Sequence, residues 1–201
     1  MTIDPFQKIF QEIQASPENA QLTAREVAPL YYAGPDVRIN IIAQAPGQRA
    51  QEQRMFWNDR SGVRLRQWLG VSWDEFYHSG KIGIMPMDFY FPGNGPHGDR
   101  PPRPDFAQHW HPQLLKLMPN IQLTILVGAY AAHAYLHLPK STKLTSIVHH
   151  YQEYLPTYFP IVHPSPRNQI WLAKNPWFGE TVLPDLKQRV RHILNQGSDS
   201  L

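Results

Sequence analysis

Hydrophobic and polar residues follow two spacings along the chain, one typical of helices and the other of buried strands. Asp4 and Pro5 precede apolar residues three or four positions apart, which predicts an N-terminal helix that Asp4 caps. Residues 17–36 are polar and interrupted by prolines, so they are predicted to form a connection. Short apolar runs predict four strands, at residues 37–43, 81–87, 121–128 and 157–163.

Further helices are predicted between and after these strands, at residues 61–69, 105–118, 129–136 and 178–195. The first of them has an expected apolar face made of Val63, Leu65, Trp68 and Leu69. A loop rich in proline and glycine spans residues 92–104. Strands that alternate with helices predict an α/β fold, a three-layer αβα sandwich around a central, mainly parallel, four-stranded sheet. No repeat or linker divides the chain, so we expect a single domain over residues 1–201.

Composition narrows the class of protein. Hydrophobic residues at 42% and charged residues at 17% are typical of a folded globular chain. The chain has no cysteine, which excludes a disulfide, a thiolate nucleophile and a cysteine-ligated cluster. No apolar run approaches the roughly 20 residues that span a bilayer, and the N-terminus does not resemble an export signal. We therefore expect a cytoplasmic protein without a membrane partner. We also expect it to be a monomer.

The charge balance permits a polyanionic partner without requiring one. The net charge is +3, from 19 lysines and arginines against 16 aspartates and glutamates. A nucleic-acid surface would therefore depend on local clusters of basic residues, such as Arg60, Arg64 and Arg66.

The last predicted strand leads into a polar loop, His163-Pro164-Ser165-Pro166. Each proline fixes its own φ and disfavours the helical region for the residue before it, so His163 and Ser165 are expected in an extended segment. Loops at strand ends often carry chemistry, because the strand positions them and the loop exposes them. Without other motifs, this loop is equally consistent with an ordinary structured turn.

Three earlier segments give the loop a context. Residues 43–47, Ala-Gln-Ala-Pro-Gly, resemble the G-E-A-P-G motif of uracil-DNA glycosylases. Residues 56–65 resemble the P-F-V-G-R-A-G-x-x-L segment that follows it, and residues 127–132 resemble the L-G-A-x-A-A junction. His163-Pro164-Ser165 falls where the final H-P-S motif of these proteins does. Four segments in order, within residues 37–194, identify the chain as resembling the uracil-DNA glycosylase superfamily.

The resemblance implies an enzyme that hydrolyses the N-glycosidic bond of a uracil or related base in DNA, without a metal, an iron–sulfur cluster or an organic cofactor. By resemblance, His163 donates a hydrogen bond to the base, and the backbone around Gln44 and Ala45 assists it. Trp57 aligns with the aromatic residue that stacks on the base, and Phe56 is the neighbouring candidate. Trp57 could instead belong to the hydrophobic core.

The expected partner is DNA with a damaged base, in single- or double-stranded form. Ser165 is expected to hold a phosphate, and Ser61 to contact DNA at the start of its helix. Arg167 or Asn168 would reach toward the gap left by the everted base. The alternative for Arg167 and Asn168 is that they cap the next turn.

The chain departs from the family pattern at the catalytic carboxylate. Gln44 and Ala45 occupy the two positions at which relatives carry a glutamate or an aspartate. General-base assistance typically contributes 10²–10⁴ in rate, so a slow enzyme or another water-positioning group is implied. Asp59 is a nearby substitute, and its alternative role is to cap the local loop.

A second departure concerns recognition of the base. Relatives select uracil with an asparagine on the strand before the proline-rich loop, where ungapped alignment places Met85. Asp88 is close in sequence and, when ionised, offers only acceptors, which suits a base with an exocyclic amine. Two other functions therefore stay open: a DNA- or nucleobase-binding module without turnover, and a pocket for a free base or nucleotide. His133 and His137 have the spacing of a metal pair, but no carboxylate accompanies them, so no metal site is expected.

Overall fold

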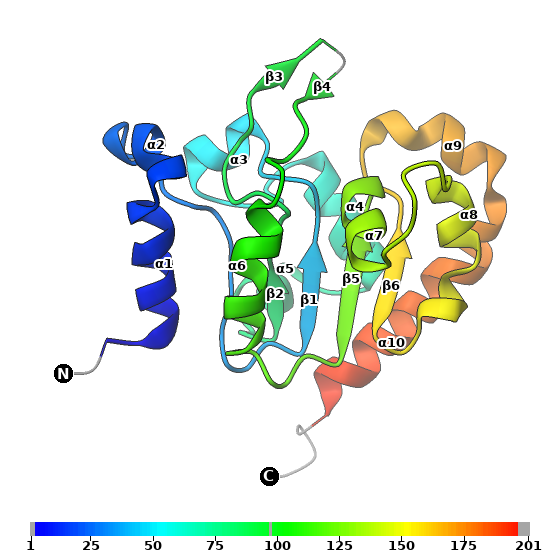
Figure 1. Ribbon diagram of the computed structural model, residues 1–201. Helices are drawn as coiled ribbons and strands as arrows, with labels where there is room; N and C mark the ends of the chain where they lie inside the picture. The colour runs from blue at the N-terminus through cyan, green and yellow to red at the C-terminus, as the bar shows by residue number, and fades with distance from the viewer. Residues whose placement is uncertain (1–2, 97, 197–201) are drawn as a thin grey trace.

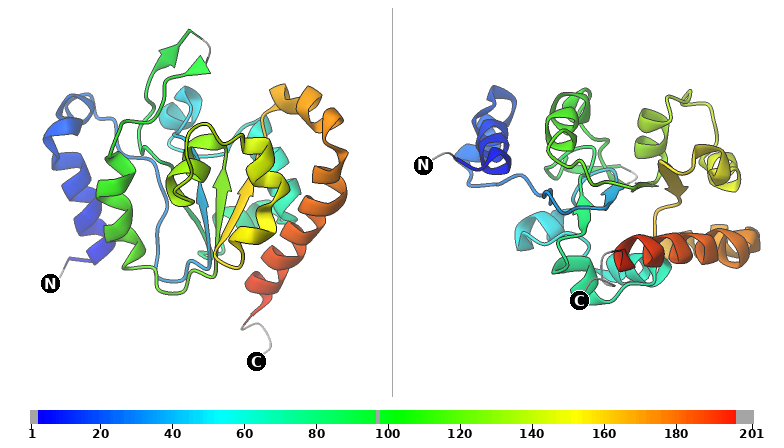
Figure 2. Two further views of the ribbon diagram at one scale, coloured as in Figure 1. Left: turned by 45° about the vertical axis from the view of Figure 1, so that its right-hand side comes forward. Right: turned by 90° about the horizontal axis from the view of Figure 1, so that it is seen from below.

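The computed structural model describes residues 3–96 and 98–196, and its centre is a parallel sheet between two layers of helices (Figures 1 and 2). The strand order is β2-β1-β5-β6, and each neighbouring pair is parallel. The strands are β1 (Ile39–Ile42), β2 (Ile82–Ile84), β5 (Leu123–Val127) and β6 (Tyr158–Ile161). The prediction of an αβα sandwich with a four-stranded sheet is confirmed, and each strand is shorter than predicted.

The strands of the sheet are buried and mostly apolar because helices cover both faces of the sheet. All five residues of β5 are buried, as are all four residues of β1 beside it. The register pairs Ile39 with Leu123 and Ile41 with Ile125, so β-branched and leucine side chains of adjacent strands lie side by side. Parallel strands also bring their carboxyl ends to one edge of the sheet, where the loops that follow them meet.

Helices of two layers enclose this sheet (Figure 2). One layer contains α1 (Pro5–Ala15), α6 (Phe106–Leu115), α7 (Ala129–Tyr135) and α8 (Leu144–His149). The other contains α4 (Arg60–Leu69), α5 (Trp73–Tyr77) and α10 (Leu183–Asn195), the last preceded by a π-helical turn, Phe178–Val182. Short helices α2 (Ala20–Ala24), α3 (Gln48–Gln53) and α9 (Gln169–Lys174) lie in the connections, with 3₁₀ turns at Pro17–Asn19, Tyr151–Tyr154 and Pro166–Asn168.

Three details correct or confirm the predicted helices. The Asp4 carboxylate accepts a hydrogen bond from the Gln7 amide at 3.0 Å, so the predicted N-cap is confirmed. The stretch 17–36, predicted to be a connection, links α1 to β1 and contains the 3₁₀ turn and α2. Val63 is 49% exposed, so its assignment to the apolar face of α4 is wrong. At 100° per residue it lies on the opposite side of the helix from Leu65.

The proline- and glycine-rich loop contains a small hairpin, formed by β3 (Asn94–Gly95) and β4 (Gly98–Asp99), that protrudes beyond the carboxyl edge of the sheet (Figure 1). Gly93 and Gly98 have φ values of +92° and +133°, which residues with a Cβ rarely adopt. Among the helices of the described stretches, none has the length and hydrophobicity needed to cross a membrane.

Candidate functional site

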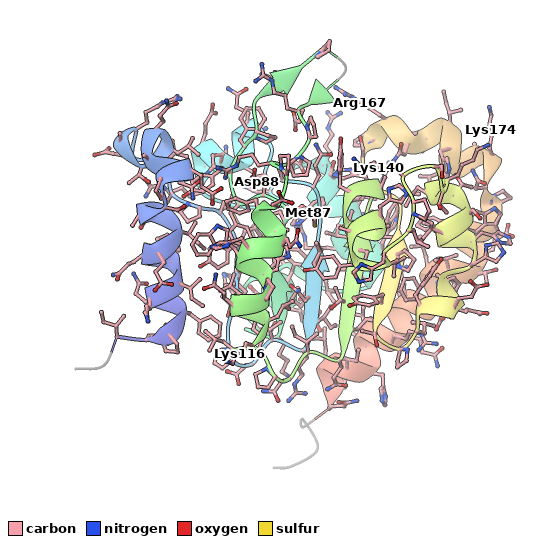
Figure 3. All side chains as sticks on the ribbon, viewed as in Figure 1. Met87, Asp88, Lys116, Lys140, Arg167 and Lys174 are labelled. Atoms are coloured by element: carbon pink, nitrogen blue, oxygen red, sulfur yellow. The ribbon has the colours of Figure 1, made fainter. Side chains whose placement is uncertain are left out.

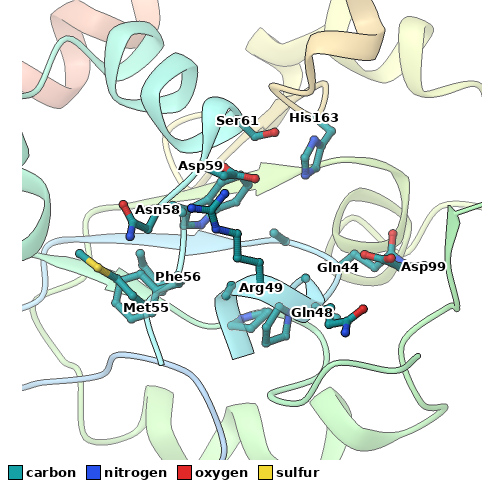
Figure 4. A pocket seen from close by; sticks show the side chains of 18 residues that line it. Gln44, Gln48, Arg49, Met55, Phe56, Asn58, Asp59, Ser61, Asp99 and His163 are labelled. Carbon is teal, nitrogen blue, oxygen red and sulfur yellow. The ribbon is translucent and has the colours of Figure 1, made fainter. Parts of the chain in front are cut away.

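A cavity of about 300 Å³ opens at the carboxyl edge of the sheet (Figure 4). Five separate segments form its walls: the turn after β1 with the start of α3, the segment before α4, the end of β2, the hairpin, and the loop after β6. His163 and Trp57 both line it, as do Gln44, Ala45, Phe56 and Ser61. The structure therefore brings together residues more than one hundred positions apart in the sequence.

His163 faces this cavity beside Trp57. The centroids of the two rings are 5.5 Å apart, and the ring planes are inclined by 34°. Neither imidazole nitrogen has a hydrogen-bond partner among the described residues. Burial lowers the pKa of His163 below its ordinary value, while the negative charges of Asp59 and Asp99 oppose that shift. The ring is therefore neutral near pH 7 and presents one donor and one acceptor.

The turn after β1 contributes its backbone. Within the part of the chain that the structure describes, the amides of Gln44 and Ala45 make no hydrogen bond to protein. The Gln44 side chain is engaged elsewhere, because its Nε2 donates to the carbonyl oxygen of Arg100 at 2.9 Å. Gln44 can therefore offer the cavity a backbone donor, while its carboxamide ties the turn to the proline-rich loop.

Phe56 and Trp57 are both half-buried at the cavity wall. Trp57 has a φ of +55°, in the left-handed region that bulky residues avoid. Its carbonyl group presses against the first turn of α4, where a Cβ on Gly62 would lie only 1.6 Å from the Trp57 oxygen. Only glycine fits at that position.

Met85 was expected at the base-binding wall, and the structure does not place it there. Its side chain is fully buried in a core cluster with Phe89, Leu114 and Met118. Its sequence neighbours Ile84 and Pro86 line the cavity instead. Side chains alternate between the two faces of an extended chain, so a shift of one position decides which residue reaches the site.

Asp88 was also expected to face the base, and its carboxylate is occupied by other partners. Arg103 donates to both of its oxygens, from Nε at 2.7 Å and from Nη2 at 2.8 Å, and forms a bidentate ion pair. They also accept hydrogen bonds from the Tyr90 amide at 3.0 Å and the Arg103 amide at 3.1 Å. The carboxylate is buried and saturated, so it holds the proline-rich loop and has no acceptor left for a base.

In the loop after β6, some polar side chains bond within the loop and one is exposed to solvent. Asn168 Nδ2 donates to the carbonyl oxygen of His163 at 2.7 Å, and Ser165 Oγ accepts from the Arg167 amide at 3.2 Å. Asn168 and Ser165 therefore stabilise the loop internally. The Arg167 side chain is exposed, and Figure 3 labels it at the upper side of the molecule, near the hairpin. Ser61 is buried and lies at the cavity wall, in the first turn of α4.

Of the residues that the structure describes, two carboxylates line the cavity, those of Asp59 and Asp99. Asp59 caps α4, because its Oδ1 accepts from the Gly62 amide at 2.8 Å, so its predicted capping role is confirmed. Its Oδ2 has no protein partner in the stretches described here, and Figure 4 shows Asp59 and His163 at the same open space. Sequence reasoning missed Asp99, which the hairpin delivers, as well as Arg49 and Asn58 at the same wall.

No group of three side chains of the kinds that bind metals gathers anywhere in residues 3–96 or 98–196. His133, one of the pair with metal-like spacing, has its Nε2 2.8 Å from the carbonyl oxygen of Thr142.

A parallel α/β sheet with a cavity beyond the carboxyl ends of its strands defines a protein class in which ligands usually bind at that edge. The chain belongs to the uracil DNA glycosylase superfamily, whose family model matches residues 30–187, well over half of the chain. Among solved structures, a candidate uracil DNA glycosylase from Methanosarcina acetivorans, determined by solution NMR, is 12% identical. That match has a TM-score of 0.49 and covers 80% of this chain and 93% of that chain.

Proposed function

We propose that the protein is a DNA glycosylase that hydrolyses the N-glycosidic bond of a deaminated or damaged base, uracil or a related base, in DNA repair. One observation carries the proposal. The His163 imidazole and the Trp57 indole line one cavity together with the turn at Gln44 and Ala45, whose amides make no hydrogen bond to the described residues, in a chain of this superfamily. These are the groups needed to stack on a base and to stabilise it as it leaves.

The leaving base sets the chemistry. An everted nucleotide costs a few kcal/mol to extrude, and its base departs with the electron pair of the N-glycosidic bond. A neutral His163 and the amides of the turn after β1 would donate to the base oxygen on which charge develops. Preorganised donors of this kind contribute about 3 kcal/mol each to the transition state. Stacking on Trp57, with Phe56 beside it, would add about 1–3 kcal/mol of binding.

A water molecule must also be positioned to attack the sugar, and the turn after β1 has no carboxylate that could position it. Asp59 can serve instead, because its Oδ1 is fixed by the Gly62 amide and its Oδ2 has no hydrogen-bond partner among the residues described. In this step the water oxygen bonds to C1′ of the sugar and its proton passes to Asp59. The C1′–N bond breaks with its electron pair on the base. Such assistance contributes about 10²–10⁴ in rate.

Contact with DNA would come from the rim of the cavity. Arg167 is exposed at the loop after β6, Ser165 lies on the same loop, and Ser61 lies in the first turn of α4 at the cavity wall. Lysine and arginine contacts to phosphates make affinity fall with salt, so DNA binding by this rim should weaken as the ionic strength rises.

The direct test is base release from oligonucleotides that contain uracil, hypoxanthine or xanthine, in single- and double-stranded form. We expect release of at least one of these bases by the wild type and a loss of about 100-fold or more in His163→Ala. A folded wild-type protein that releases none of them contradicts the proposed activity.

A second candidate is a DNA- or nucleobase-binding module without turnover. The observation that favours it is the turn after β1, where Gln44 and Ala45 supply no carboxylate and the Gln44 side chain is bound to the Arg100 carbonyl. This function predicts salt-dependent DNA affinity that survives His163→Ala, with no base released by either protein. Release by the wild type alone excludes it.

A further inference from the structure

The peptide that carries Phe56 and Trp57 is held by two side chains outside the cavity, Arg66 of α4 and Tyr77 of α5. Arg66 Nη1 donates to the carbonyl oxygen of Trp57 at 3.1 Å and lies 3.2 Å from the Tyr77 hydroxyl. That hydroxyl in turn donates to the carbonyl oxygen of Phe56 at 2.8 Å. One connected pair of side chains therefore fixes two consecutive carbonyl groups of the cavity wall.

Arg66 is oriented by aromatic rings instead of a carboxylate. The side chain is buried, and among the described residues no carboxylate forms an ion pair with it. Its guanidinium carbon lies 4.8 Å from the ring centroid of Trp73, and Phe76 and Tyr77 are 5.6 Å and 5.5 Å away. A cation over aromatic faces is attracted by the ring quadrupoles. Helix α5 thus sets the direction in which Arg66 presents its N–H groups.

Tyr77 locates Phe56 in two ways. Its ring stacks on the Phe56 ring with centroids 5.9 Å apart and planes inclined by 23°. Burial raises the pKa of Tyr77, and the positive charge of Arg66 opposes that shift. The phenol is therefore protonated at neutral pH and acts as the donor to the Phe56 carbonyl.

Such support is needed because of the conformation of Trp57. A bulky residue keeps a φ of +55° only where contacts with the surrounding structure hold it in that conformation. Without Arg66 and Tyr77, the peptide could relax toward an ordinary φ, and the indole would move away from its position 5.5 Å from the His163 ring. A displacement of about 1 Å at a reacting centre can reduce the rate by as much as 100-fold.

We propose that Arg66 and Tyr77 are positioning residues for base recognition, which hold the Trp57 indole in the orientation that stacks on an everted base. The inference rests on the proposed glycosylase function. Neither side chain is among the described residues that line the cavity, so any effect on the base must pass through the peptide of Phe56 and Trp57.

Tyr77→Phe tests the inference with the loss of a single oxygen atom. We expect the single-turnover rate of base release to fall about tenfold. Affinity for the same oligonucleotide with an abasic site should change less than about twofold, because no base is present to stack. In a Trp57→Ala background, Tyr77→Phe should cause no further loss, since coupled residues are not additive. Tyr151→Phe is the matched control, a buried tyrosine outside the cavity, and should leave the rate unchanged.

The outcomes separate this inference from the proposed function. Release by the wild type together with an unchanged rate in Tyr77→Phe overturns the inference alone, as does a full additional loss in the Trp57→Ala background. A wild type that releases none of the three bases, and binds base-containing DNA no better than abasic DNA, overturns both. Arg66→Lys, which keeps the charge but loses the planar fork, should show the same pattern as Tyr77→Phe.

Discussion

Asn168 Nδ2 lies 2.7 Å from the carbonyl oxygen of His163, so the residue five positions beyond the histidine fixes its backbone. This bond closes the loop after β6 on itself and sets the direction from which the imidazole enters the cavity. Asn168 was expected to face DNA or to cap the turn, and its bond is directed inward.

Asn168→Asp should therefore slow base release about tenfold or more, because an ionised aspartate cannot donate to the His163 carbonyl. Single-turnover kinetics would measure the loss. Asn175→Asp provides the control, since Asn175 Nδ2 makes the same kind of bond, at 2.8 Å to the carbonyl of Trp171, which does not line the cavity. Equal losses of rate in the two variants would count against a positioning role for Asn168.

Asp59→Asn isolates the chemistry of Asp59 from its capping role. Asparagine is as good an N-cap as aspartate, so the thermal unfolding midpoint should stay close to that of the wild type. The rate of base release should fall by about 10²–10⁴, because the amide cannot take the proton of the attacking water. Asp99→Asn removes the other carboxylate at the cavity and should have a smaller effect. A wild-type rate in Asp59→Asn would exclude Asp59 as the general base.

The buried His111 should make stability depend on pH. Its Nε2 lies 3.0 Å from the Pro86 carbonyl and its Nδ1 2.5 Å from the Tyr135 hydroxyl, which suits a neutral ring. Burial lowers the pKa of His111 to about 4, while the Pro86 carbonyl opposes the shift. Between pH 6.5 and pH 4 the unfolded chain binds the proton and the folded chain does not, so stability falls as the pH falls.

The loss over that range should be about 3 kcal/mol. Denaturant unfolding at pH 7 and pH 4 measures it, and the same pair of measurements on His111→Leu gives the background from other groups. A pH dependence that is identical in the two proteins would show that His111 does not titrate as its surroundings suggest.

Gly62→Ala should strongly destabilise the protein, because the added Cβ would lie 1.6 Å from the backbone oxygen of Trp57. We expect a loss of about 3 kcal/mol or more in the free energy of unfolding, at the upper end of overpacking effects. Gly179→Ala is the matched comparison, since its Cβ would meet no atom of the described residues within 4 Å, and it should be neutral or slightly stabilising. Comparable destabilisation by both substitutions would contradict the close approach at Gly62.

The sequence allowed the sheet and the convergence of its loops to be predicted, because both follow from local patterns and one topological rule. Apolar runs marked β1 and β6, and parallel strands end at a common edge, so the turn at Gln44 and the loop at His163 had to meet. The helix cap at Asp59 was likewise encoded within three residues.

The lining of the cavity was less predictable, because it depends on single-residue register and on distant contacts. A shift of one position sends Met85 into the core and Pro86 to the cavity. Arg103 forms an ion pair with Asp88, and the hairpin places Asp99 at the cavity. Both contacts depend on the path of a loop, which the hydrophobic pattern of the sequence does not predict.

The bond between the Gln44 carboxamide and the Arg100 carbonyl has a mechanical implication. This bond connects the loop that carries the β3–β4 hairpin to the turn whose amides would donate to the departing base. If DNA binds against the hairpin, a displacement of that loop would be transmitted through this bond to the turn at Gln44.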